Sequence, residues 1–261
     1  MEAKGSGSAR ETSLEEIARL CLAAGRMLLE CGANARTVHN GLSAMALGLG
    51  CTAAEVYCQH SAVIVMLRRG QESLTHMGKV GEHGANLRRG EAVSDLVEEV
   101  TAGRMDCATA CAALKKVPEM AGGYAPWVVC LSTGLACGAF GRLLGMEWGA
   151  FLPVVAGAAA GQWARMMMLS RGLNYFFMVT VVAFTAAFLA GLGGRLAGDG
   201  HLAITTVAAT LLLVPGMAML NAQVDAIDGR PNLAAARAFR VAYILLFMTL
   251  GLALAQRAVG V

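Results

Sequence analysis

Five apolar stretches in the second half of the chain constrain its fold more than any other feature. They lie near residues 126–144, 149–168, 175–194, 202–222 and 239–258. A helix needs about 20 apolar residues to cross the hydrocarbon core of a bilayer. Each stretch reaches about that length, so the sequence predicts an α-helical polytopic membrane protein with five transmembrane helices.

Charged residues divide the chain into two parts. Residues 1–120 hold 27 charged side chains, whereas residues 121–261 hold only 12. This step in composition indicates a soluble part followed by a membrane-embedded part. We predict a disordered tail at 1–12, a cytoplasmic domain at 13–118 and a transmembrane domain at 119–261. The net charge of +3 is too small to indicate a nucleic-acid partner.

The soluble part is predicted to begin with two helices. Ser13 and Glu16 form an S-x-x-E capping box, in which each residue satisfies a free N–H group of the other. Apolar residues then recur at helical spacing until Gly32 ends the helix. The second helix has an apolar inner face made of Val38, Leu42, Met45 and Leu49.

The apolar period then changes, which predicts an α+β domain. Val63, Val65 and Leu67 alternate with outward-facing residues, as in a strand that turns at Arg69-Gly70 and returns over 71–77. Helical spacing resumes at about 86–102 and at 106–117, and we expect Pro118 to close the last helix.

Basic residues predict the orientation in the membrane. With the soluble domain in the cytoplasm, seven of them fall inside and three outside, in agreement with the positive-inside rule. Those inside are Lys115, Lys116, Arg165, Arg171, Arg230, Arg237 and Arg240, and those outside are Arg142, Arg195 and Arg257. The first 13 residues contain no apolar segment, so no cleaved signal peptide is expected. The N-terminus is predicted inside the cell and the C-terminus outside.

Cysteine and histidine patterns do not indicate a metalloprotein. Six of the eight cysteines lie in the soluble part without a C-x-x-C pair, which favours a reducing compartment. A zinc site made of Cys107, Cys111 and a histidine is one alternative, and buried thiols that act as small apolar groups are the interpretation that we favour. The soluble domain's histidines are expected to be ordinary surface or interface residues, and they are His39, His60, His76 and His83.

Small residues are frequent in the apolar stretches. Three G-x-x-x-G pairs occur, at Gly134/Gly138, Gly141/Gly145 and Gly157/Gly161. Such residues let helix backbones approach closely in a membrane, either for packing alone or for helices that slide during transport. Five spans with so much small-residue surface also suggest an incomplete unit, since many transporters consist of two related halves.

Pro215 and Gly216 interrupt the fourth apolar stretch. In a helix interior, proline costs about 3 kcal/mol and glycine about 1 kcal/mol relative to alanine. Lipid offers no partner for the backbone groups that are freed, but transporters use broken helices to present such groups to substrates and ions. We predict that the fourth helix resumes after the break and ends at Gly229-Arg230-Pro231.

Asn221, Asp225 and Asp228 follow the break at positions i, i+4 and i+7, so they share one helix face. Acids near a helix C-terminus oppose the helix dipole, so capping does not explain them. One interpretation is that both acids are solvated at the end of the helix. The other is that Asp225 couples transport to protons or faces the substrate path.

Further polar residues lie in the second and fourth spans. Gln162 and Arg165 end the second span. One interpretation is that Arg165 and Arg171 extend to the membrane interface. The other is that Arg165 attracts a substrate carboxylate. Three threonines (Thr205, Thr206 and Thr210) either line the fourth helix or bond back to it. The predicted substrate and ion path comprises Pro215, Gly216, Asn221, Asp225, Gln162 and Arg165.

Three stretches of the chain resemble a known family. They are "LLLVPGMAMLNAQVDAIDGRPNLAAAR", "GKVGEHGANLRRGEAVSDLVEEVTAGRMDCATACAALKKV" and "LCLAAGRMLLECGANARTVHNGLSAMALGLG". They are similar to the broken helix, the end of the soluble domain and the first two helices of the threonine/serine exporter (ThrE) family, in particular of its shorter YjjP-type members. The resemblance covers about residues 14–258. Asn34 departs from it, because an acid is expected after Gly-Ala.

The resemblance implies an inner-membrane exporter of small carboxylate-bearing metabolites that is driven by the proton gradient. It also implies a separate five-span YjjB-type subunit, and substrates such as threonine and serine or succinate. No cofactor is implied, and a higher oligomer is possible. A membrane-bound enzyme is disfavoured because the sequence has no phosphate loop, nucleophile elbow or H-E-x-x-H motif. The remaining alternative is a membrane-anchored sensor whose cytoplasmic domain binds a ligand.

Overall fold

The chain forms two compact units. The computed structural model describes residues 12–81, 84, 86–120 and 124–261, so nearly all of the predicted tail, as well as His83, lies outside the described residues. The first unit comprises Met1–Gly122 and Met217–Arg237, and the second comprises Gly123–Gly216 and Ala238–Val261. The segment that follows the Pro215–Gly216 break therefore belongs to the same unit as residues 13–118.

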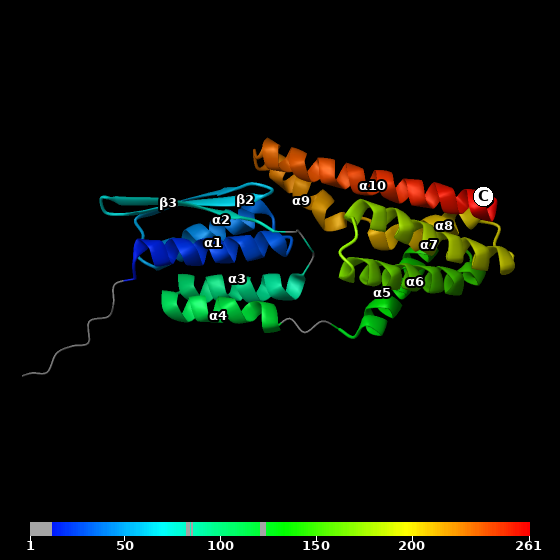
Figure 1. Cartoon of the computed structure of the whole chain (residues 1–261), viewed down its shortest axis with the longest axis horizontal. Coiled ribbons are helices and arrows are strands. Elements are labelled where there is room, and N and C mark those ends of the chain that lie inside the picture. The colour runs from blue at the N-terminus through cyan, green and yellow to red at the C-terminus, as the bar shows by residue number, and fades with distance from the viewer. Residues whose placement is uncertain (1–11, 82–83, 85, 121–123) are drawn as a thin grey trace, which may run out of the picture. The chain divides into compact units, whose positions relative to one another are not determined.

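The first unit has a three-stranded antiparallel sheet and two layers of helices (Figure 1). Its elements are α1 (Leu14–Glu30), α2 (Ala35–Gly48), β1 (Ala53–Cys58), β2 (Ala62–Arg69), β3 (Glu72–Lys79), α3 (Leu87–Thr101) and α4 (Cys107–Met120). Helices α1 and α2 lie between the sheet and the pair α3–α4. The central strand β2 points Val63, Val65 and Leu67 into the core, where each is 0% exposed. This alternation matches the predicted strand.

The predicted start of α1 is confirmed. The Ser13 hydroxyl accepts a hydrogen bond from the Glu16 N–H at 3.2 Å, and the Glu16 carboxylate accepts one from the Ser13 N–H at 3.1 Å. The inner face of α2 is confirmed for Val38, Leu42 and Met45, which are all fully buried, whereas Leu49 is half-buried and follows the helix as its C-cap residue.

Two details of the first unit differ from the prediction. The sheet has one strand more than expected, β1, which pairs with β2 so that Val56 faces Val65. The turn between these strands, at residues 59–61, contains no glycine, proline or asparagine that would have indicated it. In addition, Pro118 lies inside α4 instead of ending it. Proline there removes only one N–H donor close to the end of the helix, so the last residues stay helical.

The cysteines of the first unit are mostly buried in its core. Cys21, Cys58 and Cys107 are at most 7% exposed, as expected for thiols that act as apolar groups. Burial raises the pKa of Cys21 and of Cys107 to about 12 and that of Cys58 to about 11. These thiols therefore stay protonated at neutral pH, and a protonated thiol is a poor nucleophile.

Alkylation will test this burial. In the folded protein at pH 8, iodoacetamide is expected to leave Cys21, Cys58 and Cys107 unmodified, because neither the thiolate form nor a free path for the reagent is available. After denaturation all three should react, and peptide mass spectrometry will compare the two samples. Fast modification of Cys21 in the folded chain would contradict the core arrangement.

The second unit is entirely helical in its described residues. It contains α5 (Pro126–Leu143), the short helix η1 (Trp148–Ala150), α6 (Phe151–Ser170), α7 (Tyr175–Leu196), α8 (Leu202–Thr210) and η2 (Leu211–Leu213), with most of α10 (Pro231–Val259). The fifth apolar helix thus begins at Pro231, earlier than the predicted residue 239. Proline is well suited to a first helical position, where no partner for its missing N–H is needed.

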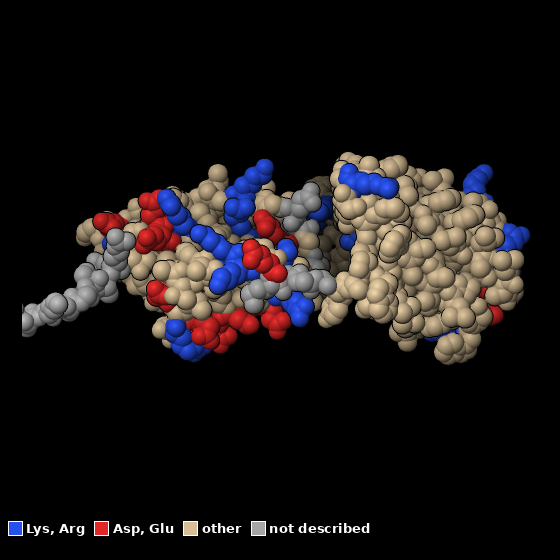
Figure 2. Space-filling model, turned by 60° about the horizontal axis from the view of Figure 1, so that its bottom comes forward, with Lys and Arg blue, Asp and Glu red and all other residues tan. Residues whose placement is uncertain are grey.

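The described helices give partial support for the predicted spans. Helices α7 and α10 are long and apolar enough to cross a membrane, and α8–η2 with α9 (Gly216–Ile227) forms a third, interrupted candidate. Helices α5 and α6 have 18 and 20 residues, but they are not among the candidate spans, and each contains glycines and one arginine. Five spans therefore remain a prediction. On the face drawn in Figure 2, charged side chains gather on the first unit and are sparse on the second.

Glycines in α5 and α6 bring helix backbones together. A Cβ atom on Gly157 would lie 2.6 Å from the Ala186 carbonyl oxygen, and one on Gly134 would meet the Val155 carbonyl oxygen. Gly161 has a similarly close neighbour in the Ala186 side chain, at 2.9 Å. Gly145 differs from the predicted pattern: its φ of +93° places it in the turn after α5, and a Cβ there would meet nothing within 4 Å.

Candidate functional site

The fourth apolar helix is interrupted at Pro215. Helix η2 ends at Leu213, and Val214 has an extended backbone with φ −62° and ψ 120°. Helix α9 then runs from Gly216 to Ile227, and Gly229, with a φ of +73°, turns the chain into α10. This confirms that the helix resumes after the break and ends at Gly229-Arg230-Pro231. A left-handed residue such as Gly229 is the usual way to end a helix.

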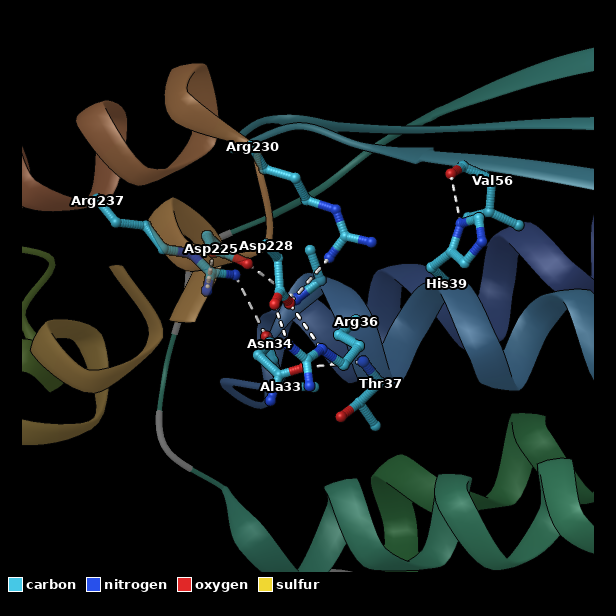
Figure 3. A network of polar contacts seen from close by, with 11 residues as sticks. Ala33, Asn34, Arg36, Thr37, His39, Val56, Asp225, Asp228, Arg230 and Arg237 are labelled. Carbon is cyan, nitrogen blue, oxygen red and sulfur yellow. Dashed lines mark hydrogen bonds and ion pairs between the residues drawn. The ribbon is translucent and has the colours of Figure 1, made fainter. Parts of the chain in front are cut away.

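The polar face of α9 binds the turn between α1 and α2, within the first unit (Figure 3). Asn221 donates a hydrogen bond from its side-chain nitrogen to the carbonyl oxygen of Gly32 at 2.7 Å. Asp225 accepts one from the backbone N–H of Ala35 at 3.4 Å. Both side chains thus face one short segment, as their spacing of four residues predicts for neighbours on a helix.

Asp225 and Arg237 form a buried ion pair. The side chains are 0% and 6% exposed, and Asp225 Oδ2 lies 2.7 Å from Arg237 Nη1. Arg237 also donates a hydrogen bond to the carbonyl oxygen of Ala33 at 3.2 Å. The carboxylate lies at the N-terminus of α2, where free N–H groups and the helix dipole favour negative charge. Asp225 is therefore neutralised from two directions.

Asp228 and Arg36 form a second, more exposed ion pair. Asp228 accepts hydrogen bonds from both Arg36 Nε, at 2.8 Å, and Arg36 Nη2. Arg230 lies farther away, with 3.9 Å between its Nη1 and Asp228 Oδ2. The hydrogen bonds from Arg36 hold the pKa of the Asp228 carboxyl below its usual value, because they stabilise the charged form.

The lowered pKa of Asp228 predicts a pH dependence. A carboxyl group whose pKa is lower in the folded state stabilises the fold above its unfolded pKa of about 3.9, and this contribution disappears as the pH falls through the folded value. The difference in melting temperature between the wild type and Arg36→Met should therefore be constant from pH 8 to about pH 5 and shrink below about pH 4. A difference that already shrinks between pH 8 and pH 6 would show that another group titrates.

Asn34 starts helix α2 beside these pairs. Its side-chain oxygen accepts a hydrogen bond from the Thr37 N–H at 2.8 Å, which is the usual N-cap arrangement. Asparagine caps a helix about as well as aspartate, so the amide serves the same local role as the acid expected at this position. It does so without adding a negative charge close to Asp225.

We call these residues the docking cluster: Asn34, Arg36, Asn221, Asp225, Asp228, Arg230 and Arg237. It holds three arginines and two aspartates. Each carboxylate already has an arginine partner, so the cluster offers no free carboxylate to a metal ion. One guanidinium group remains in excess, which makes the cluster suited to an anion.

The structure argues against one of the two interpretations of the acids, and the role of Asp225 in transport stays a prediction. Asp225 is fully buried and the Asp228 side chain is 8% exposed, so neither is solvated at the end of its helix. The prediction from sequence did not include Arg36 or Arg237 in the site. Residues 221–237 contain two aspartates and two arginines. This balance of charge was the only indication in the sequence that the acids have arginine partners nearby.

The other predicted path residues lie outside the first unit or on its boundary. Gln162 and Arg165 are half-buried in α6 of the second unit, and Pro215 and Gly216 form the break itself. The threonines of α8 are buried: Thr206 and Thr210 bond back to carbonyl oxygens of their own helix, and Thr205 donates to Asp199. The expectation that such threonines bond back to the helix is confirmed for two of the three.

A cavity of about 300 Å³ lies beside the docking cluster. It is open to the surface and is lined by residues of the α1–α2 turn, α3 and α9, all within the first unit. Its polar lining residues are Asn34, Thr37, Glu91, Ser94 and Asn221. Asn221 and Asn34 belong both to this cavity and to the cluster, so a ligand there would touch the residues that hold α9 in place.

Comparisons with known proteins agree with these features. A family model described as "Putative threonine/serine exporter" matches residues 19–258. A relative from Klebsiella aerogenes, named "Probable succinate transporter subunit YjjP", is 24% identical over 92% of this chain and 93% of its own length. A relative from Escherichia coli (strain K12) with the same name is 25% identical over 85% of this chain and 86% of its own length. No solved structure matches the chain significantly. The chain, with its apolar helices and its broken fourth helix, therefore belongs to the threonine/serine exporter (ThrE) family of membrane transport proteins.

Proposed function

We propose that this chain is one subunit of a proton-driven exporter of small carboxylate metabolites, either threonine and serine or a dicarboxylate such as succinate. It acts with a second membrane subunit of five spans, in the inner membrane, with its N-terminus in the cytoplasm and its C-terminus outside. The observation that carries the proposal is the interrupted helix α8–α9, whose second arm ends in the docking cluster. Membership of an exporter family and relatives that are named as transporter subunits support it.

In this proposal the break presents polar backbone to the substrate path. Pro215 carries no N–H to donate to the preceding turn, and Gly216 has no side chain to cover the backbone, so a ligand or ion could approach the carbonyl groups there. Transporters use broken helices near the middle of the membrane in this way. Gln162 and Arg165 of α6 contribute an amide and a positive charge to the same path, and Asn221 lies one to two turns after the break.

Asp225 is proposed as the proton-coupling carboxylate and Arg237 as its switchable partner. In the described state the two neutralise each other at 2.7 Å. Protonation of Asp225 removes one charge of the pair and weakens its hold on Arg237. Because an inward proton gradient drives export only by exchange, the proton and the substrate must occupy the transporter in alternate states, so binding of one must disfavour binding of the other.

Transport in proteoliposomes will test the proposal. Vesicles that contain this chain and the second subunit are loaded with labelled succinate, threonine or serine, and efflux is measured with and without a pH gradient. We expect efflux to depend on both subunits and on the gradient, and Asp225→Asn to remove the dependence on the gradient. Asp95→Asn, at an exposed position of α3, is the matched control and should behave like the wild type. Unchanged gradient dependence in Asp225→Asn at equal expression would remove Asp225 from the mechanism.

A second candidate is a sensor subunit whose soluble unit binds a ligand. The cavity beside Asn34 and Asn221 favours it, since a ligand there would contact α9 directly. The same efflux assay separates the two functions. Efflux by the second subunit alone, at the full rate, would assign a sensory role to this chain and would contradict the exporter proposal.

A further inference from the structure

The second unit contains three neighbouring side chains of types that can bind a metal ion. None of them belongs to the predicted substrate path. Glu147 lies in the loop between α5 and η1, and Asp199 and His201 lie in the loop between α7 and α8. One possible ligand atom from each residue lies within 4.8 Å of those of the other two. Residues about 50 positions apart in the sequence are thus brought together at one end of the unit.

Hydrogen bonds orient the Asp199 side chain, and His201 lies close to Glu147. The Asp199 carboxylate accepts hydrogen bonds from the Thr205 hydroxyl and from the His201 N–H, the latter at 3.1 Å. The His201 Nδ1 atom lies 3.3 Å from Glu147 Oε1. A carboxylate whose second oxygen is held by a neighbouring hydroxyl is a common arrangement around metal ions, because it orients the ligand.

A second observation that points to a cation is the burial of Asp199 within the cluster. It is only 7% exposed, and within the described part of the chain no basic side chain forms an ion pair with it; the seven ion pairs found involve other acids. A buried carboxylate without a counter-charge is costly, and such groups are normally paired or coordinate a metal. By contrast, Asp225, the other deeply buried acid, has Arg237.

We propose that Glu147, Asp199 and His201 form a site for a divalent transition-metal ion of the zinc type. An imidazole with two carboxylates suits zinc, manganese or nickel, whereas magnesium and calcium prefer ligand sets made of oxygen atoms alone. Three protein ligands leave one or more positions for water. In a tetrahedral site, bonds of about 2.0–2.2 Å place the ligands about 3.3–3.6 Å apart, so the exposed Glu147 and His201 side chains would move inward on binding the ion.

The bound ion would join two loops of the second unit. Glu147 precedes η1 and α6, whereas Asp199 and His201 precede α8, the first arm of the broken helix. Metal binding would therefore fix the start of α8 against the start of α6. This inference does not depend on the proposed export function, because the site is made of other residues.

Calorimetry on the purified full-length chain will test the site. After removal of metals with a chelator, we expect one equivalent of zinc to bind, magnesium in excess not to compete, and His201→Ala and Glu147→Gln to weaken binding by about tenfold or more. Both side chains are more than half exposed, so these variants should fold. His76→Ala and Glu55→Gln, in the first unit, are the matched controls and should bind like the wild type.

Cobalt(II) spectra will distinguish this site from the eight cysteines. Nitrogen and oxygen ligands give weak visible bands without the intense thiolate-to-metal absorption of a cysteine site. Bands of the first kind that disappear in His201→Ala would support the proposal. Thiolate absorption, equal affinity in the variants and the wild type, or no binding of a transition metal would each overturn it.

Discussion

Replacing Arg237 with methionine is expected to destabilise the first unit by about 3–5 kcal/mol. The change leaves the Asp225 carboxylate, which is 0% exposed, without its cation in the interior of the unit, and breaking a buried ion pair on one side typically costs about this much. The carbonyl oxygen of Ala33 also loses its hydrogen bond from Arg237. The melting temperature of the purified chain will measure the loss, and hydrogen exchange at residues 31–38 will localise it.

Two further variants make this prediction specific. Asp225→Leu combined with Arg237→Met should recover most of the stability, since replacing both ions with apolar groups removes the unpaired charge. Arg26→Met is the matched control, because the Arg26 side chain is 50% exposed and its pairing with Glu30, at 3.9 Å, is a surface contact. Such contacts contribute about 0–1 kcal/mol. If Arg237→Met melts like Arg26→Met, the ion pair does not hold α9 and the first residues of α10, up to Arg237, to the rest of the first unit.

Substituting alanine for Gly157 is expected to destabilise the second unit by about 1–3 kcal/mol or more. The new Cβ would lie 2.6 Å from the Ala186 carbonyl oxygen and 2.8 Å from the Ala190 nitrogen, which are backbone atoms of α7. A side chain could rotate away, but a helix backbone has to move as a whole. Helices α6 and α7 would therefore separate, with loss of the packing around Ala186 and Ala190.

The sign of this effect distinguishes packing from helix propensity. Alanine favours a helix over glycine by about 1 kcal/mol, so destabilisation by alanine means that the contact with α7 outweighs that gain. Gly149→Ala is the matched control in the same unit, because its Cβ would be 3.7 Å from the nearest atom, an ordinary contact. Melting curves in detergent will compare the two variants. A higher melting temperature for Gly157→Ala would contradict the close approach of the helices.

The broken helix shows which features can be predicted from local sequence and which cannot. Pro215 and Gly216 have a low helix propensity wherever they occur, so the interruption and the end of the helix near Gly229 could be predicted. The spacing of Asn221 and Asp225 likewise follows from helix geometry alone. The nature of the surface opposite that face could not be predicted, because the Gly32–Ala35 segment is about 190 residues away in the sequence.

The missed strand and the wrong helix end have a similar explanation. The turn before β2 contains only one of the residue types that mark turns, Ser61, so the sequence did not separate β1 from β2, and their pairing is seen only in the structure. Pro118 is a helix breaker by its local chemistry, but only the structure shows that α4 tolerates it. Local signals are weak wherever a long-range contact stabilises the same segment.

The sequence by itself determined the division into a charged and an apolar part, the capping box, the helix break and the shared face of α9, because composition, propensity and periodicity act over a few residues. Only the tertiary structure decided that Asp225 is buried against Arg237, that Arg36 holds Asp228, and that Glu147 meets His201. Those contacts join segments far apart in the chain, and charge signs alone do not specify which of several arginines or acids becomes the partner. The energy of a buried charge depends on that partner, so the tertiary structure sets the chemistry of both clusters.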